Sequence, residues 1–477
     1  MTEWLYAFDS ANYAFAVRDY YTVAHHRPHP PGYPLYVAIA RAIDLVVHDA
    51  NRSLVLEGIL LSALAVASAT GLAGALYGRA AGLLAGLLLL FTVGFWGYGE
   101  VAYPYVALAA EMATLALLAH WTIAGRRWVA VPLGLSIGAA AGIRWDGAIF
   151  CAPLWLWALW SVPWRLRVAS AATAGAVCLV WAVPMVQLSG GWDIYAGAVS
   201  DYLKAWAPQS AYVVGGFESG QGTLALYNLN FFVNYARQML GVGIVSVLYV
   251  LGRRFGPSQL AVDYRSRFLA LWIVPPILTY VFTHLGEPGY VLSLAPQAAT
   301  LAAVAALDLG HETRMLSGAL RARGWQWLPA PPVAGRAVTA LLVLGVVGWN
   351  VQAFLRGVGP GRLPDLRAHD ATTGAQVAFL AEQPPGSTLV LAHDLVRHVQ
   401  FYLPGYPVQL LYSEYVPGWD TVRLRADLPP GVTQVVVLDA ALQVPPEDAP
   451  RVRSVVLREQ PRVAVWVVDV RGARAVE

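Results

Sequence analysis

The sequence predicts an α-helical polytopic membrane protein with a small C-terminal α/β domain. Only 13% of the 477 residues are charged, whereas soluble domains usually carry about 25%. Hydrophobic residues make up 57% of the chain, and many form runs of the length that crosses a bilayer. These runs end near Phe354, after which the composition becomes that of a soluble domain. An ordinary soluble enzyme and a disordered chain are therefore excluded. The formal net charge of +3 is too small to indicate nucleic acid binding.

About ten apolar runs are candidate transmembrane helices. They cover residues 54–76, 80–98, 101–123, 128–143, 147–162, 168–188, 231–252, 268–284, 289–307 and 336–354. The apolar run 33–47 is shorter and contains Arg41 and Asp44, so it fits either a span or an interfacial helix. Loops rich in arginine tend to be cytoplasmic. If residues 54–76 run from outside to inside, the arginine-rich loops all fall on the cytoplasmic side. This topology makes residues 33–47 an external juxtamembrane helix instead of a span.

This topology gives a transmembrane domain over residues 1–356 whose first external loop is 1–50. An external segment with no helix before it is unusual, so we expect one transmembrane helix upstream of Met1. Residues 357–369 contain several Gly and Pro residues and are interpreted as a linker. Residues 370–477 are interpreted as a soluble extracytoplasmic α/β domain. Its expected strands are 387–392, 433–439 and 462–468, and its expected helices are 375–382 and 395–402.

Acidic residues are scarce, which makes their positions informative. Asp9 precedes a rigid, polar loop that holds His29 and Tyr33 among several prolines. Residue chemistry alone leaves two interpretations of Asp9 open. It caps a helix that starts near Ala11, or it is a catalytic carboxylate. His29 could act as an acid, a base or a metal ligand.

Two further clusters lie at predicted external helix junctions. Glu100 is followed by Tyr103, and it either faces water within an aromatic belt or belongs to a site. Arg144 and Asp146 are two residues apart, and they form either a structural ion pair or an arginine site for phosphate. The two interpretations of this pair are equally well supported by the sequence.

A fourth cluster contains His284, Glu287 and Tyr290, and part of it is ordinary turn chemistry. Glu57 and Glu111 fall within predicted spans. We expect Glu111 to face the bundle interior and Glu57 to reach the external interface. Because the predicted topology puts all four clusters on one side, we expect them to surround one external cavity.

The segment of about Phe8–Tyr105 resembles the GT-C fold glycosyltransferases, which include protein O-mannosyltransferases and lipid A aminoarabinose transferases, and the rest of the chain resembles them only in its architecture. The resemblance lies in Asp9-Ser10 with Asn12-Tyr13-Ala14, followed by His29-Pro30-Pro31-Gly32-Tyr33-Pro34. Gly78-Arg79 matches the end of the second span of that family, and Glu100 matches its second external acidic residue. The mannosyltransferases have an Asp-Glu pair where this chain has Asp9-Ser10.

The resemblance implies an inverting transferase that moves a sugar from a polyprenyl-phosphate donor to an acceptor hydroxyl. The implied location is the plasma (inner) membrane, with the site on its extracytoplasmic face. Asp9 would be the general base, and Glu100 would orient the acceptor or help to hold a metal. Arg144 and His29 would bind the donor phosphate. The other candidate substrate-binding residues are Tyr33, Tyr103, Asp146, His284, Glu287 and Tyr290.

Several questions stay open at this stage. The sequence requires no cofactor, and a divalent metal, if one is used, would take ligands from Asp9, Glu100 and His29. The acceptor is undetermined among protein, lipid and glycan. A lipid or glycan transporter or flippase is an alternative, although no internal repeat is evident. A non-catalytic membrane scaffold is a second alternative, although a scaffold has no need of Asp9, Glu100 and His29 in one cavity.

Overall fold

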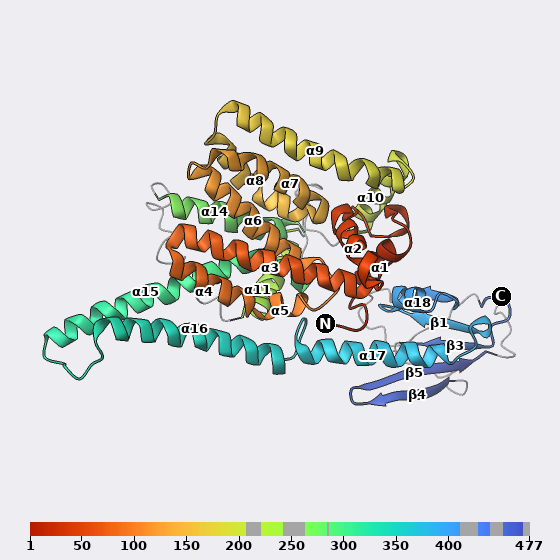
Figure 1. The fold of residues 1–477 in the computed structure, drawn as a ribbon. Coiled ribbons are helices and arrows are strands. Elements are labelled where there is room, and N and C mark those ends of the chain that lie inside the picture. Colours follow the sequence, from red (N-terminus) through yellow and green to blue (C-terminus); the bar gives the residue numbers. More distant parts are fainter. Residues whose placement is uncertain (207–220, 242–262, 284–285, 411–427, 439–451, 471–477) are drawn as a thin grey trace.

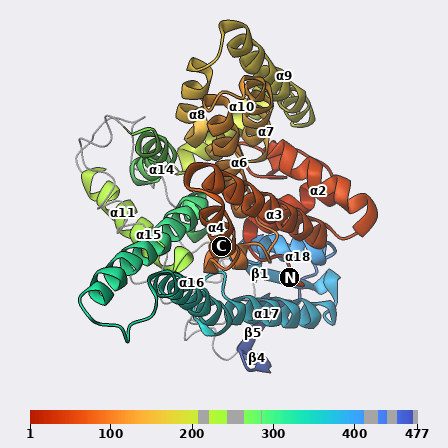
Figure 2. The same cartoon turned by 60° about the vertical axis from the view of Figure 1, so that its left-hand side comes forward.

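A computed structural model describes residues 1–206, 221–241, 263–283, 286–410, 428–438 and 452–470 (Figure 1). A body of packed helices fills one end of the molecule, and the C-terminal sheet domain lies at the other end. The long helices α15 and α16 lie side by side in both views (Figures 1 and 2). Their connection points away from the C-terminal domain (Figure 1).

The predicted spans coincide with helices throughout the described residues. These helices are α3 (Ala50–Tyr77), α4 (Arg79–Leu90), α5 (Val93–Tyr98), α6 (Tyr105–Ile123), α7 (Ala130–Ile143), α8 (Trp145–Trp160), α9 (Trp164–Leu188), α11 (Gln221–Leu240), α14 (Tyr264–Phe282), α15 (Ala295–Ala322) and α16 (Pro331–Arg356). The predicted fold class is confirmed.

Some boundaries differ from the prediction. The run 80–98 forms two helices, α4 and α5, instead of one. The run 231–252 begins within α11, and its part from 242 onwards lies outside the described residues. Among the described residues, five segments are long and apolar enough to cross a membrane on their own: Ala50–Tyr77, Tyr105–Ile123, Trp164–Leu188, Pro288–Ala322 and Pro331–Arg356.

The segment before α3 is folded and mostly helical. It contains α1 (Phe8–Arg18), the short helix η1 (Val23–His25) and α2 (Pro34–Val47). At a rise of 1.5 Å per residue, the 14 residues of α2 span about 21 Å, less than the ~30 Å of a bilayer core. Tyr36 and Val37 are buried against the body, while Leu45 and Val46 are largely exposed. This length and this one-sided burial fit the predicted juxtamembrane helix.

Close helix crossings in the body depend on small residues. A Cβ atom on Gly82 of α4 would lie 2.5 Å from the carbonyl oxygen of Thr70 in α3. A Cβ atom on Gly134 of α7 would lie 2.2 Å from the carbonyl oxygen of Ser170 in α9. Small residues let helix backbones approach each other, and this is how helices gain packing energy in a lipid environment.

The C-terminal domain is a five-stranded mixed sheet in the order β2-β1-β3-β5-β4. The strands are β1 (Thr388–Ala392), β2 (Val408–Leu410), β3 (Gln434–Val437), β4 (Val452–Glu459) and β5 (Arg462–Asp469), with β1 parallel to both β2 and β3. Helices α17 (Leu363–Ala381) and α18 (Val396–Tyr402) bury apolar side chains against one face of the sheet. The three predicted strands and both predicted helices are present. However, α17 begins within the predicted linker 357–369, so helix replaces the second half of that linker.

Candidate active site

Asp9 lies in the first turn of α1, but it does not cap this helix. The N-cap residue is Ala7, and its backbone N–H donates to the Oγ of Ser10. The interpretation of Asp9 as a cap for a helix near Ala11 is therefore wrong, because the helix already begins at Phe8 and the Asp9 carboxylate points to other partners.

Three side chains hold the carboxylate of Asp9. Asn12 Nδ2 donates to Oδ1 at 3.2 Å, and the Tyr103 hydroxyl donates to Oδ2 at 3.3 Å. His29 Nδ1 lies 3.2 Å from Oδ1. Burial alone would raise the pKa of Asp9, but the charge of His29 and these polar contacts outweigh it and hold the pKa below its usual value. The Asp9 side chain nevertheless keeps 32% of its surface exposed, so an ionised carboxylate is accessible from outside the protein.

The loop between α1 and α2 brings His29 and Tyr33 to Asp9. Gly32 has a φ of +128°, and a Cβ atom there would lie 2.6 Å from the Sδ of Met185, so the turn requires glycine. Tyr33 also has a positive φ, of 96°. Its ring packs 5.1 Å from His29 and 5.3 Å from Tyr13. A bulky residue in this backbone region is strained, and such strain gathers at functional sites.

Arg144 and Asp146 form a sealed ion pair at the junction of α7 and α8. Arg144 donates to Asp146 Oδ2 from Nε at 3.2 Å and from Nη2 at 3.0 Å, and the two side chains are 4% and 7% exposed. The guanidinium carbon lies 4.7 Å from the Tyr105 ring centre and 4.9 Å from that of Tyr290. The geometry is that of a structural ion pair inside an aromatic cage, and it holds Tyr290 beside Arg144.

Aromatic contacts connect this ion pair to the Asp9 site. Tyr33 lies between them, with its ring centre 6.0 Å from the guanidinium carbon of Arg144. Tyr103 packs on Tyr105 at 4.6 Å between ring centres, and Tyr105 packs on Tyr290 at 5.2 Å. The Asp9 carboxylate and the Arg144–Asp146 pair thus lie along one continuous wall of tyrosine rings.

Two carboxylates predicted to lie in membrane spans are buried, and neither has a hydrogen-bond partner among the described parts of the chain. Glu111 is buried in α6, as expected for a residue that faces the bundle interior, and its carboxylate lies against Gly147 of α8. Glu57 of α3 is fully buried, and neither of its oxygens has a partner. The expectation that Glu57 reaches the external interface is therefore wrong, because α2 and α6 both pack against α3.

Glu100 and Glu287 differ in their relation to Asp9. The Glu100 carboxylate forms an ion pair with the amino group of Met1, and its backbone oxygen accepts from the Thr2 N–H at 3.0 Å. Glu287 is exposed, but the surrounding protein and the negative charges of Asp9 and Asp394 raise its pKa to about 7. The pKa of Glu287 therefore depends on the charge of Asp9, whereas the long-range contacts of Glu100 are with Met1 and Thr2. The candidate His284 lies outside the described residues.

The C-terminal domain adds an arginine to the site that the sequence did not reveal. Arg397 of α18 donates from Nε to Asn12 Oδ1 at 2.7 Å, and its Nη2 donates to the backbone oxygens of His25 and His26. Asn12 in turn donates to Asp9. Arg397 thus orients the amide that holds the candidate carboxylate. In the sequence it is one arginine on a short helix, and no motif marks it.

The N-terminal segment joins the C-terminal domain to α1. The backbone oxygen of Leu5 accepts from His369 Nε2 and from His398 Nε2, both at 2.8 Å. The backbone N–H groups of Glu3 and Trp4 donate to the Asp370 carboxylate at 3.0 and 3.1 Å. These contacts fix α17 and α18 against the segment that leads into Asp9.

The predicted metal ligands are not gathered in one place. Within the described ranges, no group of three or more His, Cys, Asp or Glu side chains is arranged to hold a metal ion. Asp9 and His29 lie together, and Glu100 pairs with Met1 instead.

Comparison with known proteins identifies the class of fold. No protein-family model and no curated protein matches the sequence. The structure is similar to ArnT from Cupriavidus metallidurans in the apo state, with a TM-score of 0.60 and 14% identity over 99% of this chain and 95% of ArnT. The same ArnT bound to undecaprenyl phosphate gives a TM-score of 0.57 and 15% identity over 99% and 96% of the two chains.

A third similar structure is the oligosaccharyltransferase from Archaeoglobus fulgidus in the apo form. Its TM-score is 0.50 with 13% identity, and the match covers 85% of this chain but 61% of that enzyme. ArnT and the oligosaccharyltransferase are GT-C fold membrane glycosyltransferases. This chain therefore has the GT-C fold, and the resemblance inferred from the Asp9 and His29 segments is confirmed at the level of fold.

Proposed function

We propose that the protein is a membrane glycosyltransferase that moves a sugar from a polyprenyl-phosphate donor to an acceptor hydroxyl on the extracytoplasmic face. The main support is the Asp9 site, because its carboxylate has a lowered pKa, is held by three side chains and belongs to a side chain that is 32% exposed. The fold it shares with ArnT, which has been solved with undecaprenyl phosphate, supports a lipid-linked donor.

In the proposed reaction, Asp9 is the general base. The acceptor oxygen attacks the anomeric carbon as its proton passes to the Asp9 carboxylate. The bond between this carbon and the phosphate oxygen breaks, and the lipid phosphate leaves with the electron pair. A single displacement of this kind inverts the anomeric centre. A positioned base typically contributes about 10²–10⁴-fold to the rate.

His29 and Arg144 have different proposed parts in binding the donor. His29 lies next to Asp9 with only 9% of its side chain exposed, so we assign it to holding the Asp9 carboxylate and to meeting the donor phosphate at the edge of the opening beside Asp9. Arg144 is already paired with Asp146 and caged by tyrosines, so we assign it to shaping the wall through Tyr33, Tyr105 and Tyr290. A donor phosphate would have to share this guanidinium with Asp146.

Two other carboxylates complete the proposal. Glu287 is exposed near Asp9 and has a pKa of about 7, which suits a group that orients the acceptor through hydrogen bonds. Glu100 is the weaker half of the catalytic pair expected from the sequence, because its backbone oxygen is held by the Thr2 N–H of the N-terminal segment and no described contact joins it to Asp9. We propose that Tyr103 positions Asp9 through its hydroxyl.

The test is sugar transfer by membranes that contain the full-length protein, with a panel of radiolabelled polyprenyl-phosphate sugars. Asp9→Asn removes the proposed base with little change of shape. The matched control is Asp19→Asn, because Asp19 follows α1 with a similar exposure of 30% and pairs with Arg18 and Arg27. We expect transfer from at least one donor, its loss in Asp9→Asn and its retention in Asp19→Asn.

The other outcomes are equally informative. Equal transfer by Asp9→Asn and the unchanged protein would remove Asp9 as the base while the enzyme class stands. Absence of transfer from every donor, by protein that is well expressed and folded, would overturn the proposal. A donor lipid that crosses the bilayer without sugar transfer would support the transporter alternative instead.

A further inference from the structure

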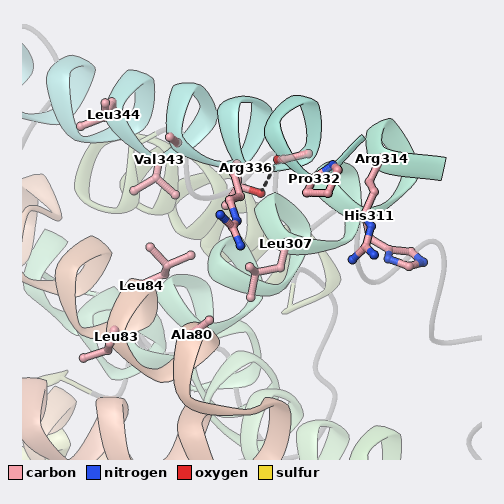
Figure 3. Close-up of a pocket in the computed structure, with 14 residues that line it drawn as sticks. Ala80, Leu83, Leu84, Leu307, His311, Arg314, Pro332, Arg336, Val343 and Leu344 are labelled. Carbon is pink, nitrogen blue, oxygen red and sulfur yellow. Dashed lines mark hydrogen bonds between the residues drawn. The ribbon is translucent and has the colours of Figure 1, made fainter. Parts of the chain in front are cut away.

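A large cavity lies at the end of the helical body that is remote from the C-terminal domain (Figure 3). Its volume is about 680 Å³, and it lies between the start of α4, the second half of α15 and the first half of α16. The Asp9 site is formed by α1, the loop before α2, the turn before α6 and α18, so the two sites share no element.

The lining of this cavity is basic at one end and apolar at the other. Arg314 and His311 of α15 lie together at one end, and Arg336 of α16 points into the space between the helices (Figure 3). The apolar end is formed by Leu83, Leu84, Val343 and Leu344. Among the fourteen described residues that line the cavity, none is acidic.

The helical spacing keeps acidic side chains of α15 away from this lining. The α15 residues in the lining are Leu307, Gly310, His311 and Arg314, which recur at the three- and four-residue spacing of one helix face. Asp308 and Glu312 lie on neighbouring positions outside the lining, and both have interactions of their own. The described lining of the cavity therefore carries positive charge, from two arginines on two different helices.

The position of the cavity favours an amphiphilic ligand over a small soluble anion. Both α15 and α16 belong to segments long and apolar enough to cross a membrane. Leu83 and Leu344 line the cavity and are 59% and 65% exposed, so the apolar end opens on an apolar surface of these helices. A phosphate matches the guanidinium groups at one end, and hydrocarbon matches the leucines at the other.

We propose that this cavity binds an anionic phospholipid, with its phosphate between Arg314 and Arg336 and an acyl chain along Leu83, Val343 and Leu344. The inference goes beyond the proposed transferase activity and does not depend on it. Basic residues near a membrane surface contribute about 1 kcal/mol each to the binding of anionic lipid, which equals about fivefold in affinity. Loss of both arginines should therefore weaken binding about thirtyfold.

The test is native mass spectrometry of the purified full-length protein, titrated in detergent with phosphatidylglycerol or phosphatidylcholine. We expect one phosphatidylglycerol per chain, bound at least tenfold more tightly than phosphatidylcholine. The variant Arg314→Gln/Arg336→Gln should lose about thirtyfold in affinity. The matched control is Arg127→Gln/Arg323→Gln, which removes the same charge from two exposed positions outside the cavity and should bind normally.

A second variant keeps the charge and fills the space. Ala340→Trp places an indole in the cavity from an exposed position of α16, and it should also abolish tight binding. Equal phosphatidylglycerol binding by the double variant and its control, or by Ala340→Trp and the unchanged protein, would overturn the proposal. So would equal affinity for both lipids. Displacement of phosphatidylglycerol by millimolar inorganic phosphate, or by an equimolar polyprenyl phosphate, would assign the cavity to those ligands instead.

Discussion

Asp9 and Asp146 each pair with a basic residue, but their surroundings are opposite. The Asp9 side chain is 32% exposed, and its partners come from the loop before α2, from α1 and from the turn before α6. The Asp146 side chain is 7% exposed, and Arg144, two residues away, donates to it twice. One carboxylate is open to a reacting molecule, and the other is closed in a cage of tyrosines.

From this difference we propose that Asp9 does the chemistry and that the Arg144–Asp146 pair maintains structure. A charge taken out of water is costly, and a buried pair persists only with good geometry. The Arg144–Asp146 pair meets this condition and keeps the tyrosine wall in place. An open carboxylate needs less compensation and can accept a proton from a substrate. We therefore expect variants at Asp9 to affect catalysis and variants at Asp146 to affect stability.

The largest expected effect is on the rate of transfer in Asp9→Asn. We expect kcat to fall by about 10²–10⁴-fold, the usual contribution of a general base, with KM changed little. The thermal unfolding midpoint should stay close to that of the unchanged protein because the amide has almost the same shape. Steady-state kinetics and a thermal melt check both points. If the unfolding midpoint falls far enough to account for the lost activity, the catalytic role of Asp9 is contradicted.

The next largest effect is on the stability of Asp146 variants. Asp146→Leu leaves Arg144 buried without its partner, which should cost about 3–5 kcal/mol of unfolding free energy. The double variant Arg144→Met/Asp146→Leu removes both charges and should recover most of that loss. Unfolding in detergent with a denaturant measures both variants. A single variant as stable as the unchanged protein would contradict the structural role of the pair.

How much of this site could be predicted from the sequence depends on separation along the chain. Asp9 and His29 could be predicted together because both lie in the short N-terminal segment before α2. Tyr103 reaches Asp9 across 94 positions, and Arg397 reaches Asn12 across 385 positions. No local pattern specifies such contacts, because the first depends on where the turn before α6 meets α1 and the second on the packing of α18 on α1.

The fold was more predictable than the site. Runs of about 20 apolar residues specify helices directly, so every described span appeared as a helix. The direction in which a side chain points depends on neighbouring helices, which a single sequence does not reveal. Glu57 was expected at the interface and is sealed between helices, and Glu100 was expected beside Asp9 and pairs with Met1.

The titration of Glu287 allows its proposed role in orienting the acceptor to be tested by the pH dependence of transfer. Its pKa is raised to about 7, so it loses its charge as the pH falls through 7. If the ionised form orients the acceptor, transfer should decline about tenfold per pH unit below that value. The pKa of Asp9 is lowered, so Asp9 stays ionised near pH 7 and does not contribute to this decline in the pH–rate profile. Glu287→Gln should remove the decline, and pH–rate profiles of both proteins measure it. An unchanged profile in Glu287→Gln would exclude this role.

A smaller effect is expected from Arg397, which acts on Asp9 through Asn12. Arg397→Gln should lower kcat by about threefold to tenfold, because the amide of Asn12 loses the group that orients it. Arg397→Lys keeps the charge and should recover part of the rate. The control is Arg458→Gln, at an exposed position on β4 far from this contact. A change in KM alone, with kcat intact, would indicate a substrate contact instead of a positioning role.

Chemical rescue tests the contrast between the two carboxylates most directly. Asp9→Ala leaves a gap in an open site, and Asp146→Ala leaves a gap in a sealed one. Transfer would be measured for both variants with increasing sodium formate, at constant ionic strength. We predict that formate restores part of the activity of Asp9→Ala, since a small carboxylate can enter and accept the proton, and that it does not restore Asp146→Ala. Rescue of Asp146→Ala without rescue of Asp9→Ala would contradict the account.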